Sequence, residues 1–295
     1  MKILAAFDSF KESMTAYAAG EAVQRAYNNV HVCPLADGGE GTMEVMNHYL
    51  HGDIHEIEVA GPLFKTVHAK LAIMDDLAII ESAQACGLDY LTEEEKNGTE
   101  ATSYGVGEMM KYAYDHGVKR FLLTLGGSAC NDGGIGLLSG MGYGFFDQFD
   151  QRIPMNARGL ETLDHIKKTR LDLSNIEVEG ACDVTNPLCG KEGATYVFGP
   201  QKKVKDLEKT DQAMKHYAKI MSELVGKDDS CVSGAGAAGG MGYAIVTGLN
   251  GKLVTGFDAV SRTVHLEEAI QEADIIFTGE GKMDHQTLYG KTPIG

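Results

Sequence analysis

The sequence predicts an α/β protein with a parallel sheet built from both ends of the chain and a mixed sheet in its middle. Three observations support this. Apolar strands alternate with amphipathic helical stretches over roughly the first fifty residues, which is typical of parallel β–α–β units. Short alternating segments without intervening helices follow at 54–81. A further apolar strand stands near residue 275, close to the end of the 295 residues.

The first part of the chain gives the clearest pattern. Strands are expected over residues 2–7 and 30–36, and helices over Thr15–Asn28 and Met43–Leu50. Each strand ends in a polar loop, DSFK at 8–11 and DGGEGT at 37–42. Ligands of parallel α/β sheets bind beyond the carboxyl ends of the strands, which is where both loops stand.

The middle and the end of the chain complete the expected elements, although residues 150–210 show little pattern. Alternating strands are expected at 54–61, 66–74 and 77–82, an amphipathic helix at 99–116, buried strands at 120–125 and 177–184, a helix at 204–225 and a last strand before residue 279. The alternating segments favour antiparallel or mixed pairing. A glycine-rich loop at 233–242 is expected to lead into a further helix.

Composition and charge exclude several classes of protein. The net charge is −16, and no Lys/Arg cluster is interleaved with aromatic residues, so we expect no nucleic-acid partner. The most basic stretch, QKKVK at 201–205, is interpreted as a solvated face.

Neither a membrane nor an oxidising compartment is expected. No apolar run approaches the ~18 residues of a membrane span, and Asp8 and Lys11 interrupt the N-terminal apolar run too early for a signal peptide. Six cysteines without a CxxC pair indicate reduced thiols. We therefore predict a cytoplasmic protein.

Four loops of one style carry the candidate chemistry: DSFK at 8–11, DGGEGT at 37–42, GGSACNDGG at 126–134 and TGEGKMD at 278–284. Each follows a strand and carries carboxylate or amide side chains; three of the four combine these with glycine, and two contain lysine. Phosphoryl transfer uses this inventory, because amides and a cation hold phosphates, carboxylates hold Mg²⁺, and one carboxylate can accept the hydroxyl proton.

Two other interpretations stay open at this point. Asp, Asn and Gly are also the commonest turn formers, so any single loop can be a turn only. Gly234, Gly236 and Gly239 satisfy G-x-G-x-x-G, which suggests a nicotinamide-dependent oxidoreductase, but the preceding DDSCVS is a poor buried strand. A binding protein without catalysis is the third alternative.

Taken in order, the loops resemble the bacterial glycerate kinase family of the two-domain, non-P-loop type. The resemblance runs through DSFKESMTA, PLADGGEGT, LGGSACNDGGIG, CDVTNPLCG, GAGAAGGMGYA, ADIIFTGEG and DHQTLYGKTPIG, and so spans essentially the whole chain. Glu12 stands where a glycine is usual, and Cys130 where a small residue such as threonine is usual. Family members continue past GKTPIG, so we expect the chain to be truncated at its C-terminus.

The resemblance implies ATP-dependent phosphorylation of glycerate, with Mg²⁺, in a cleft between two α/β domains. One domain is Rossmann-like and discontinuous, and the other, with a mixed sheet, is inserted into it. We place the Rossmann-like domain at 1–62 and 266–295 and the inserted domain at 63–265. The product isomer (2- or 3-phosphoglycerate), the enantiomer and the oligomeric state, with a homo-oligomer as one option, stay open.

Residue types and loop positions nominate the site. Candidate catalytic residues are Asp8, Lys11, Asp37, Asp183 (as proton acceptor) and Lys291. Candidates for binding substrate or phosphate are Ser9, Gly38, Gly39, Thr42, Gly126, Gly127, Ser128, Asn131, Gly279 and Gly281. Candidate metal ligands are Glu40, Asp132, Glu280 and Asp284.

Overall fold

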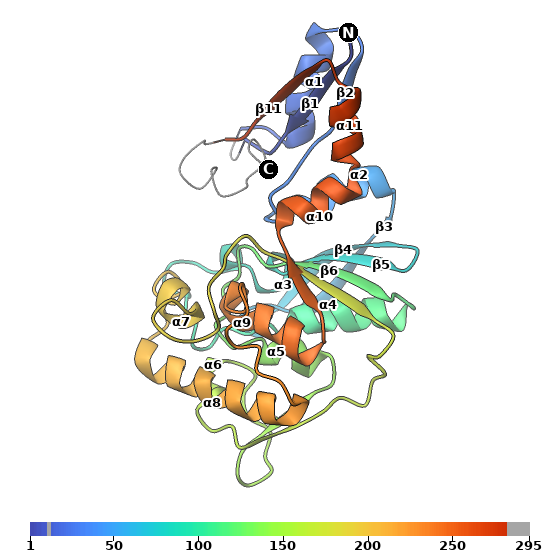
Figure 1. Cartoon of the computed structure of the whole chain (residues 1–295). Coiled ribbons are helices and arrows are strands. Elements are labelled where there is room, and N and C mark those ends of the chain that lie inside the picture. The colour runs from blue at the N-terminus through green and yellow to red at the C-terminus, as the bar shows by residue number, and fades with distance from the viewer. Residues whose placement is uncertain (11–12, 282–295) are drawn as a thin grey trace. The chain divides into compact units, whose positions relative to one another are not determined.

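The computed structural model describes residues 1–10 and 13–281, and it confirms an α/β protein with a parallel and a mixed sheet. The chain forms two compact units (Figure 1). The terminal unit comprises Met1–Gly52 and the chain from Val254 onward, and the central unit comprises Asp53–Leu253. The domain limits near residues 62 and 266 stay a prediction.

The terminal unit is built on a three-stranded sheet in the order β11-β1-β2, and both strand pairs are parallel. Its elements are β1 (Ile3–Phe7), α1 (Ala16–Ala26), β2 (Val30–Val32), α2 (Thr42–Leu50), α10 (Gly256–Thr263), α11 (Leu266–Glu272) and β11 (Ile275–Gly279). The last strand thus pairs with the first, as expected for a discontinuous Rossmann-like domain. All three carboxyl ends therefore lie at one edge of the sheet.

Local chemistry explains the first crossover. Thr15 caps α1, because its hydroxyl accepts a hydrogen bond from the Ala18 N–H at 3.1 Å. Gly20 then lets the helix approach β2, since a Cβ at this position would lie 2.4 Å from Val32 Cγ1. The Val32 side chain therefore fills the space that a larger residue at position 20 would need.

The central unit contains a six-stranded sheet in the order β10-β9-β6-β5-β4-β3. Strands β3 to β6 of this sheet are labelled in Figure 1. Its strands are β3 (Asp53–Ala60), β4 (Thr66–Met74), β5 (Leu77–Glu81), β6 (Arg120–Thr124), β9 (Glu177–Ala181) and β10 (Lys252–Val254). The pairs β3–β4 and β4–β5 are antiparallel, whereas β5–β6 and β6–β9 are parallel. The prediction of a mixed sheet is therefore confirmed.

Helices and a small hairpin complete the central unit. They are α3 (Ala83–Cys86), a 3₁₀ turn (Leu88–Tyr90), α4 (Tyr104–Asp115), α5 (Ile135–Gly140), β7 (Gly144–Phe146), α6 (Ala157–Leu160), β8 (His165–Lys167), α7 (Ala194–Phe198), α8 (Leu207–Val225), α9 (Ala237–Tyr243) and a π turn (Ala244–Gly248). None of the helices in residues 1–10 and 13–281 is long and apolar enough to cross a bilayer.

Helix α4 shows how glycine sets the packing distance. A Cβ on Gly105 would lie 2.0 Å from the Ala60 carbonyl oxygen, and one on Gly107 would lie 2.4 Å from the Leu137 carbonyl oxygen. The helix therefore touches the end of β3 and the α5 backbone directly. It begins five residues later than the sequence suggested, since the Thr102 N–H donates to the Pro62 carbonyl at 2.9 Å instead of starting a helix.

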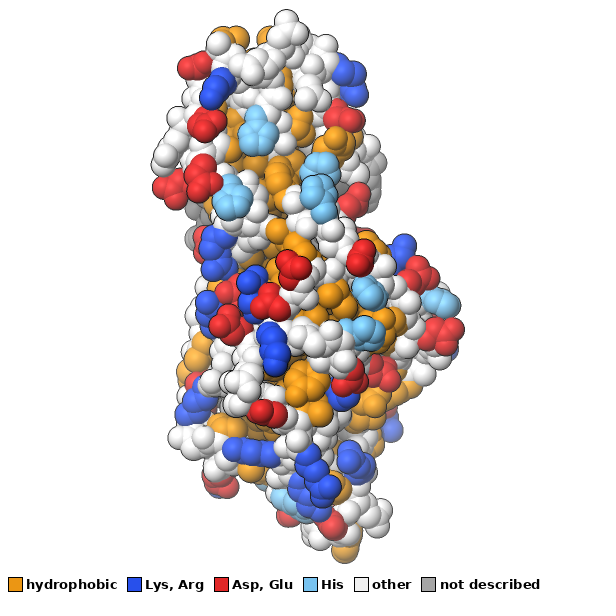
Figure 2. Space-filling view, turned by 90° about the vertical axis from the view of Figure 1, so that its right-hand side faces the viewer, with side chains coloured by type: hydrophobic (Ala, Val, Ile, Leu, Met, Phe, Trp, Pro, Cys, Tyr) orange, Lys and Arg blue, Asp and Glu red, His pale blue; other side chains and the backbone are white. Residues whose placement is uncertain are grey.

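The basic stretch at 201–205 corrects an expectation. It precedes α8, which begins after its Asp206 cap, but it is not a solvated face throughout. Lys202 is 3% exposed, whereas Lys203 is exposed and pairs with Glu93 at 3.3 Å. Elsewhere the charges are mixed: on the face shown in Figure 2, basic and acidic side chains are interspersed.

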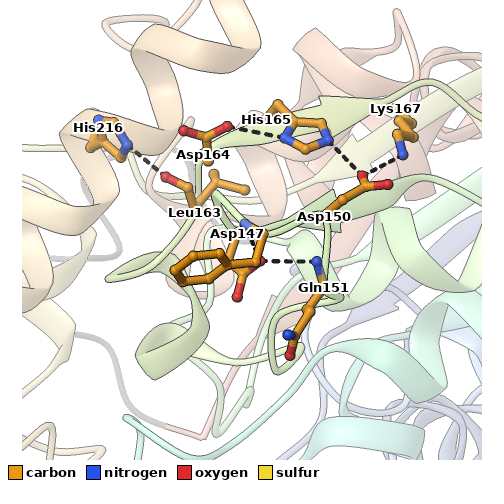
Figure 3. A network of polar contacts seen from close by, with 9 residues as sticks. Asp147, Asp150, Gln151, Leu163, Asp164, His165, Lys167 and His216 are labelled. Atoms are coloured by element: carbon orange, nitrogen blue, oxygen red, sulfur yellow. Dashed lines mark hydrogen bonds and ion pairs between the residues drawn. The ribbon is translucent and has the colours of Figure 1, made fainter.

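The small sheet β7–β8 carries an exposed polar network (Figure 3). His165 lies between two carboxylates, with 3.1 Å from Nδ1 to Asp164 and 3.1 Å from Nε2 to Asp150. Lys167 donates to the same Asp150 oxygen at 2.6 Å, and its ammonium stands over the Phe146 ring at 4.1 Å. The ion pairs join the loop between the two strands to β8, and the Lys167–Phe146 contact joins β8 to β7.

The glycines of the G-x-G-x-x-G pattern lie buried against protein atoms rather than facing a cofactor space. A Cβ on Gly234 would lie 3.0 Å from Cys182 Sγ, one on Gly236 2.3 Å from the Pro187 carbonyl, and one on Gly239 2.1 Å from the Cys130 carbonyl. The residues before Gly234 form no strand. Gly239 therefore packs α9 against the 126–134 loop, while Gly234 and Gly236 pack against the 182–187 segment, and this geometry does not suit a dinucleotide.

We expect Gly239→Ala to destabilise the protein by about 3 kcal/mol, because it adds a backbone clash to left-handed strain. Gly239 has φ +69°, and the nearest atom is the carbonyl oxygen of Cys130. Gly226→Ala is the matched control, since Gly226 has φ +82° and nothing within 4 Å, so only the strain of about 1–2 kcal/mol remains. Urea unfolding followed by circular dichroism measures both. Equal losses in the two variants would contradict the packing role.

Candidate active site

In the terminal unit, candidate residues from three loops converge at the carboxyl edge of the sheet. Asp8 and Ser9 follow β1, the 35–42 loop follows β2, and Gly279 and Glu280 lie at the end of β11. The Asp8 N–H donates to the Gly279 carbonyl at 3.0 Å, which extends the pairing of β1 with β11 by one residue. Parallel pairing therefore brings together candidates that are some 270 residues apart.

Asp8 and Glu40 line one pocket of the terminal unit. Asp8 is 7% exposed, and its Oδ1 accepts the Ser9 N–H at 2.6 Å. Glu40 is exposed, and α2 adds Glu44 from its first turn and His48 from its last turn to the same pocket. The pocket thus combines carboxylates with the aromatic pair of Tyr17 and His48, whose ring centroids are 4.8 Å apart.

The 37–42 loop is shaped by hydrogen bonds of its own. Asp37 Oδ1 accepts the Gly39 N–H at 3.1 Å, and the buried Thr42 hydroxyl donates to the Gly39 carbonyl at 2.7 Å. Gly38 and Gly41 have φ +85° and +89°, a conformation that glycine adopts without strain. The close approach to this backbone comes from Gly256, whose Cβ would lie 2.0 Å from the Asp37 carbonyl oxygen. Binding roles for Gly38, Gly39 and Thr42 stay predictions.

Four sequence candidates lie beyond the last described strand or outside the described residues. Gly281 is exposed beyond Glu280, at the end of the described chain. Lys11, Asp284 and Lys291 lie outside the residues that the structure describes. Their roles therefore stay predictions.

In the central unit, a second group of candidates lies at the carboxyl ends of two neighbouring parallel strands. Gly126 and Gly127 follow β6, and Asp183 follows β9. All three residues are exposed. Thr124 and Ala181, the last residues of these strands, are partners in the ladder, so the glycine loop and the Asp183 carboxylate share one edge of the sheet.

Asp132 and Asn131, from the same glycine loop, point inward instead. Asp132 Oδ2 accepts hydrogen bonds from Ser103 N and Ser103 Oγ, both at 2.8 Å, and from Gly136 N at 3.3 Å, and Oδ1 accepts from Gly134 N at 3.0 Å. Burial raises the pKa of this carboxyl, and the four donors act against that rise. This geometry favours a scaffold role for Asp132, while the metal role stays a prediction.

Asn131 is also fully buried. Its Nδ2 donates to the Thr195 hydroxyl at 2.9 Å, and its Oδ1 has no hydrogen-bond partner within the described chain. The side chain therefore ties the loop to α7 and leaves one acceptor unused. Substrate binding by Asn131 stays a prediction.

The terminal pocket offers carboxylate oxygens but no caged metal site among the described residues. Within residues 1–10 and 13–281, no three His, Cys, Asp or Glu side chains are grouped so that they could hold a metal. Protein-bound Mg²⁺ usually takes one or two carboxylates together with substrate phosphates and water. Asp8 and Glu40, which line one pocket, supply that number of oxygen ligands.

Two kinds of residue were not predicted from the sequence. Glu44 and His48 line the pocket with Glu40, and their spacing of four residues was a readable signal that they share one face of α2. Lys202, by contrast, carries no such signal. Its ammonium donates to Ser128 Oγ at 3.0 Å and to the Cys130 carbonyl at 2.7 Å, contacts that only the tertiary fold creates.

Comparison with known proteins gives a consistent result over the whole chain. Residues 3–295 match the model of the glycerate kinase family. A glycerate kinase of Bacillus subtilis (strain 168) is 41% identical over 307 aligned residues, which cover 100% of this chain and 80% of the relative. A glycerate 2-kinase of Escherichia coli (strain K12) is 38% identical over 307 residues, with 100% and 81% covered.

A solved structure agrees with these relatives. The crystal structure of a protein described as glycerate kinase 2 from Salmonella typhimurium LT2 superposes with a TM-score of 0.92 at 40% sequence identity. The match covers 100% of this chain and 82% of that chain.

Proposed function

The chain belongs to the glycerate kinase family, and from this premise we propose that it transfers the γ-phosphoryl group of ATP to a hydroxyl of glycerate. The relatives support a phosphotransferase acting on glycerate. The placement of Gly126, Gly127 and Asp183 at one sheet edge is the observation that supports the chemistry. Exposed amides suit a phosphate, and an exposed carboxylate beside them suits a hydroxyl proton.

The proposed reaction draws on residues of both units. Asp183 acts as the base that accepts the proton of the attacking glycerate hydroxyl. Gly126 and Gly127 donate their N–H groups to a phosphate or carboxylate oxygen. Asp8 and Glu40 belong to the terminal unit, whereas Asp183 and the glycine loop belong to the central unit.

Asp8 and Glu40 are proposed to hold Mg²⁺ carried by the nucleotide, and Asp37 to position the loop that bears Glu40. A bound Mg²⁺ would neutralise charge on the phosphate oxygens. This matters because the net charge of −16 otherwise repels an anionic nucleotide. The Asp8 carboxylate is oriented for this task by the Ser9 N–H.

We further propose 2-phosphoglycerate as the product and the cytoplasm as the compartment. The product assignment is supported by 38% identity with the glycerate 2-kinase of Escherichia coli. The compartment is supported by six free cysteines, three of them buried, because disulfides are rare in reducing surroundings.

The function is tested by ³¹P NMR of the protein with Mg-ATP and D-glycerate. We expect ADP and a new phosphomonoester signal. Phosphorus at the 2-position couples to one carbon-bound proton and gives a doublet, whereas the 3-position couples to two protons and gives a triplet. No new signal from folded protein would contradict the kinase proposal, and a triplet would contradict only the product assignment.

A further inference from the structure

A buried lysine lies under the glycine loop of the central unit. Lys202 precedes α8 and is 3% exposed, so its ammonium is almost fully withdrawn from water. Its backbone is fixed on both sides, because its N–H donates to the Gly199 carbonyl at 3.1 Å and its carbonyl accepts the Gly98 N–H at 2.6 Å. The backbone of Lys202 is therefore fixed, and its side chain is held by hydrogen bonds to Ser128 and Cys130.

The Lys202 ammonium has only neutral hydrogen-bond partners within the part of the chain that the structure describes. Its Nζ donates to Ser128 Oγ and the Cys130 carbonyl, which are neutral acceptors, and it forms no ion pair with a carboxylate there. Burial lowers the pKa of this ammonium, although the Cys130 and Cys86 thiols and the Asp132 carboxylate act in the opposite direction. Burying a cation without a direct ion pair is costly, so a lysine kept at this position points to a use for its charge.

Near Lys202 the loop has two kinds of hydrogen-bond donor, the hydroxyl of the buried Ser128 and the exposed backbone of Gly126 and Gly127. Ser128 accepts from Lys202, so its own hydroxyl proton is directed to another acceptor. The Gly127 carbonyl is used by the Leu88 N–H at 2.9 Å, and the Gly126 carbonyl by the Ser82 hydroxyl at 3.4 Å. The carbonyls of Gly126 and Gly127 are thus used within the protein. The N–H groups of this exposed turn remain to face a ligand, above the buried Lys202 ammonium.

Resting on the proposed function, we propose that Lys202 is a positioning residue for the reaction. Its buried ammonium holds Ser128 and the Gly126–Gly127 turn so that they bind an oxyanion of a substrate, either a phosphoryl group of ATP or the carboxylate of glycerate. Such a site would let a strongly acidic protein bind an anion at this edge. No lysine or arginine side chain needs to touch the ligand here.

The test measures ligand affinity and stability in the same variants. Lys202→Met keeps the length and packing of the side chain and removes the charge. Isothermal titration of wild-type and variant protein, separately with Mg-ATP and with D-glycerate, is expected to show a ten-fold to hundred-fold weaker Kd for one of the two ligands, about the loss of a charge-assisted hydrogen-bond network. The ligand that is affected identifies the oxyanion.

Lys203→Met is the matched control, because Lys203 is the exposed neighbour paired with Glu93. Its affinities and Tm should equal those of the wild type. Should Lys202→Met fail to fold, Ser128→Ala decides instead, with an expected loss of about ten-fold for the same ligand and a Tm close to the wild type.

Each other outcome has one meaning. Folded Lys202→Met with both affinities unchanged would show that Lys202 is structural only, and so would unchanged affinities in Ser128→Ala. If wild-type protein binds neither ligand, the proposed kinase function fails rather than this inference alone.

Discussion

Asp183→Asn will lower the kcat for phosphorylation of glycerate by about 10²-fold to 10⁴-fold and leave KM within a few-fold of the wild type. Asn keeps the size of the side chain but cannot accept the hydroxyl proton. Because Asp183 is exposed at the end of β9, the substitution disturbs no core packing. Steady-state kinetics with Mg-ATP and glycerate, coupled to ADP release, measures both parameters.

Glu177→Gln is the control for this prediction. Glu177 is an exposed carboxylate at the opposite end of β9. Its substitution therefore changes the net charge by the same amount as Asp183→Asn but leaves the carboxyl edge of the sheet unaltered. Its kcat should stay at the wild-type value. If Asp183→Asn turned over as fast as Glu177→Gln, Asp183 would not be the base, and the attacking hydroxyl would have to lose its proton to another group.

Strand periodicity and loop position predicted the fold well, because both depend on short-range sequence. The apolar run at 2–7 became β1, and the run before residue 279 became β11, its parallel neighbour. Similarly, alternation at 54–81 predicted antiparallel or mixed strands, and β3, β4 and β5 pair antiparallel while β5 pairs parallel with β6. The membership in the glycerate kinase family, indicated by seven ordered motifs, is also confirmed.

The sequence did not predict the direction in which the loop side chains point. Asp132 and Asp183 are the same residue type, and both follow strands of the central sheet. Asp132 is nevertheless fully buried, whereas Asp183 is exposed. Lys202 stands beside Lys203 in one basic run, yet only Lys202 turns under the glycine loop. These differences arise from tertiary contacts, 29 residues away for Asp132 with Ser103 and 74 residues away for Lys202 with Ser128, which no local pattern encodes.

Asp132→Ala should destabilise the protein by about 4 kcal/mol, since it leaves four buried donors without an acceptor. Asp132→Asn should cost only about half as much. Its amide oxygen can occupy the Oδ2 position and keep the three donors from Ser103 and Gly136, while the amide nitrogen opposes Gly134 alone. Urea unfolding followed by circular dichroism gives the two free energies of unfolding.

The same measurement separates a scaffold from a metal ligand. A scaffold carboxylate contributes equally with Mg²⁺ and with EDTA, so the losses in Asp132→Ala and Asp132→Asn should not depend on the metal. A ligand would instead stabilise wild-type protein only when Mg²⁺ is present, by linkage. Asp76→Ala, which removes an exposed partner of Arg120, should cost less than about 1 kcal/mol. If Asp132→Ala were as stable as that control, the loop would be held by its glycines rather than by its carboxylate.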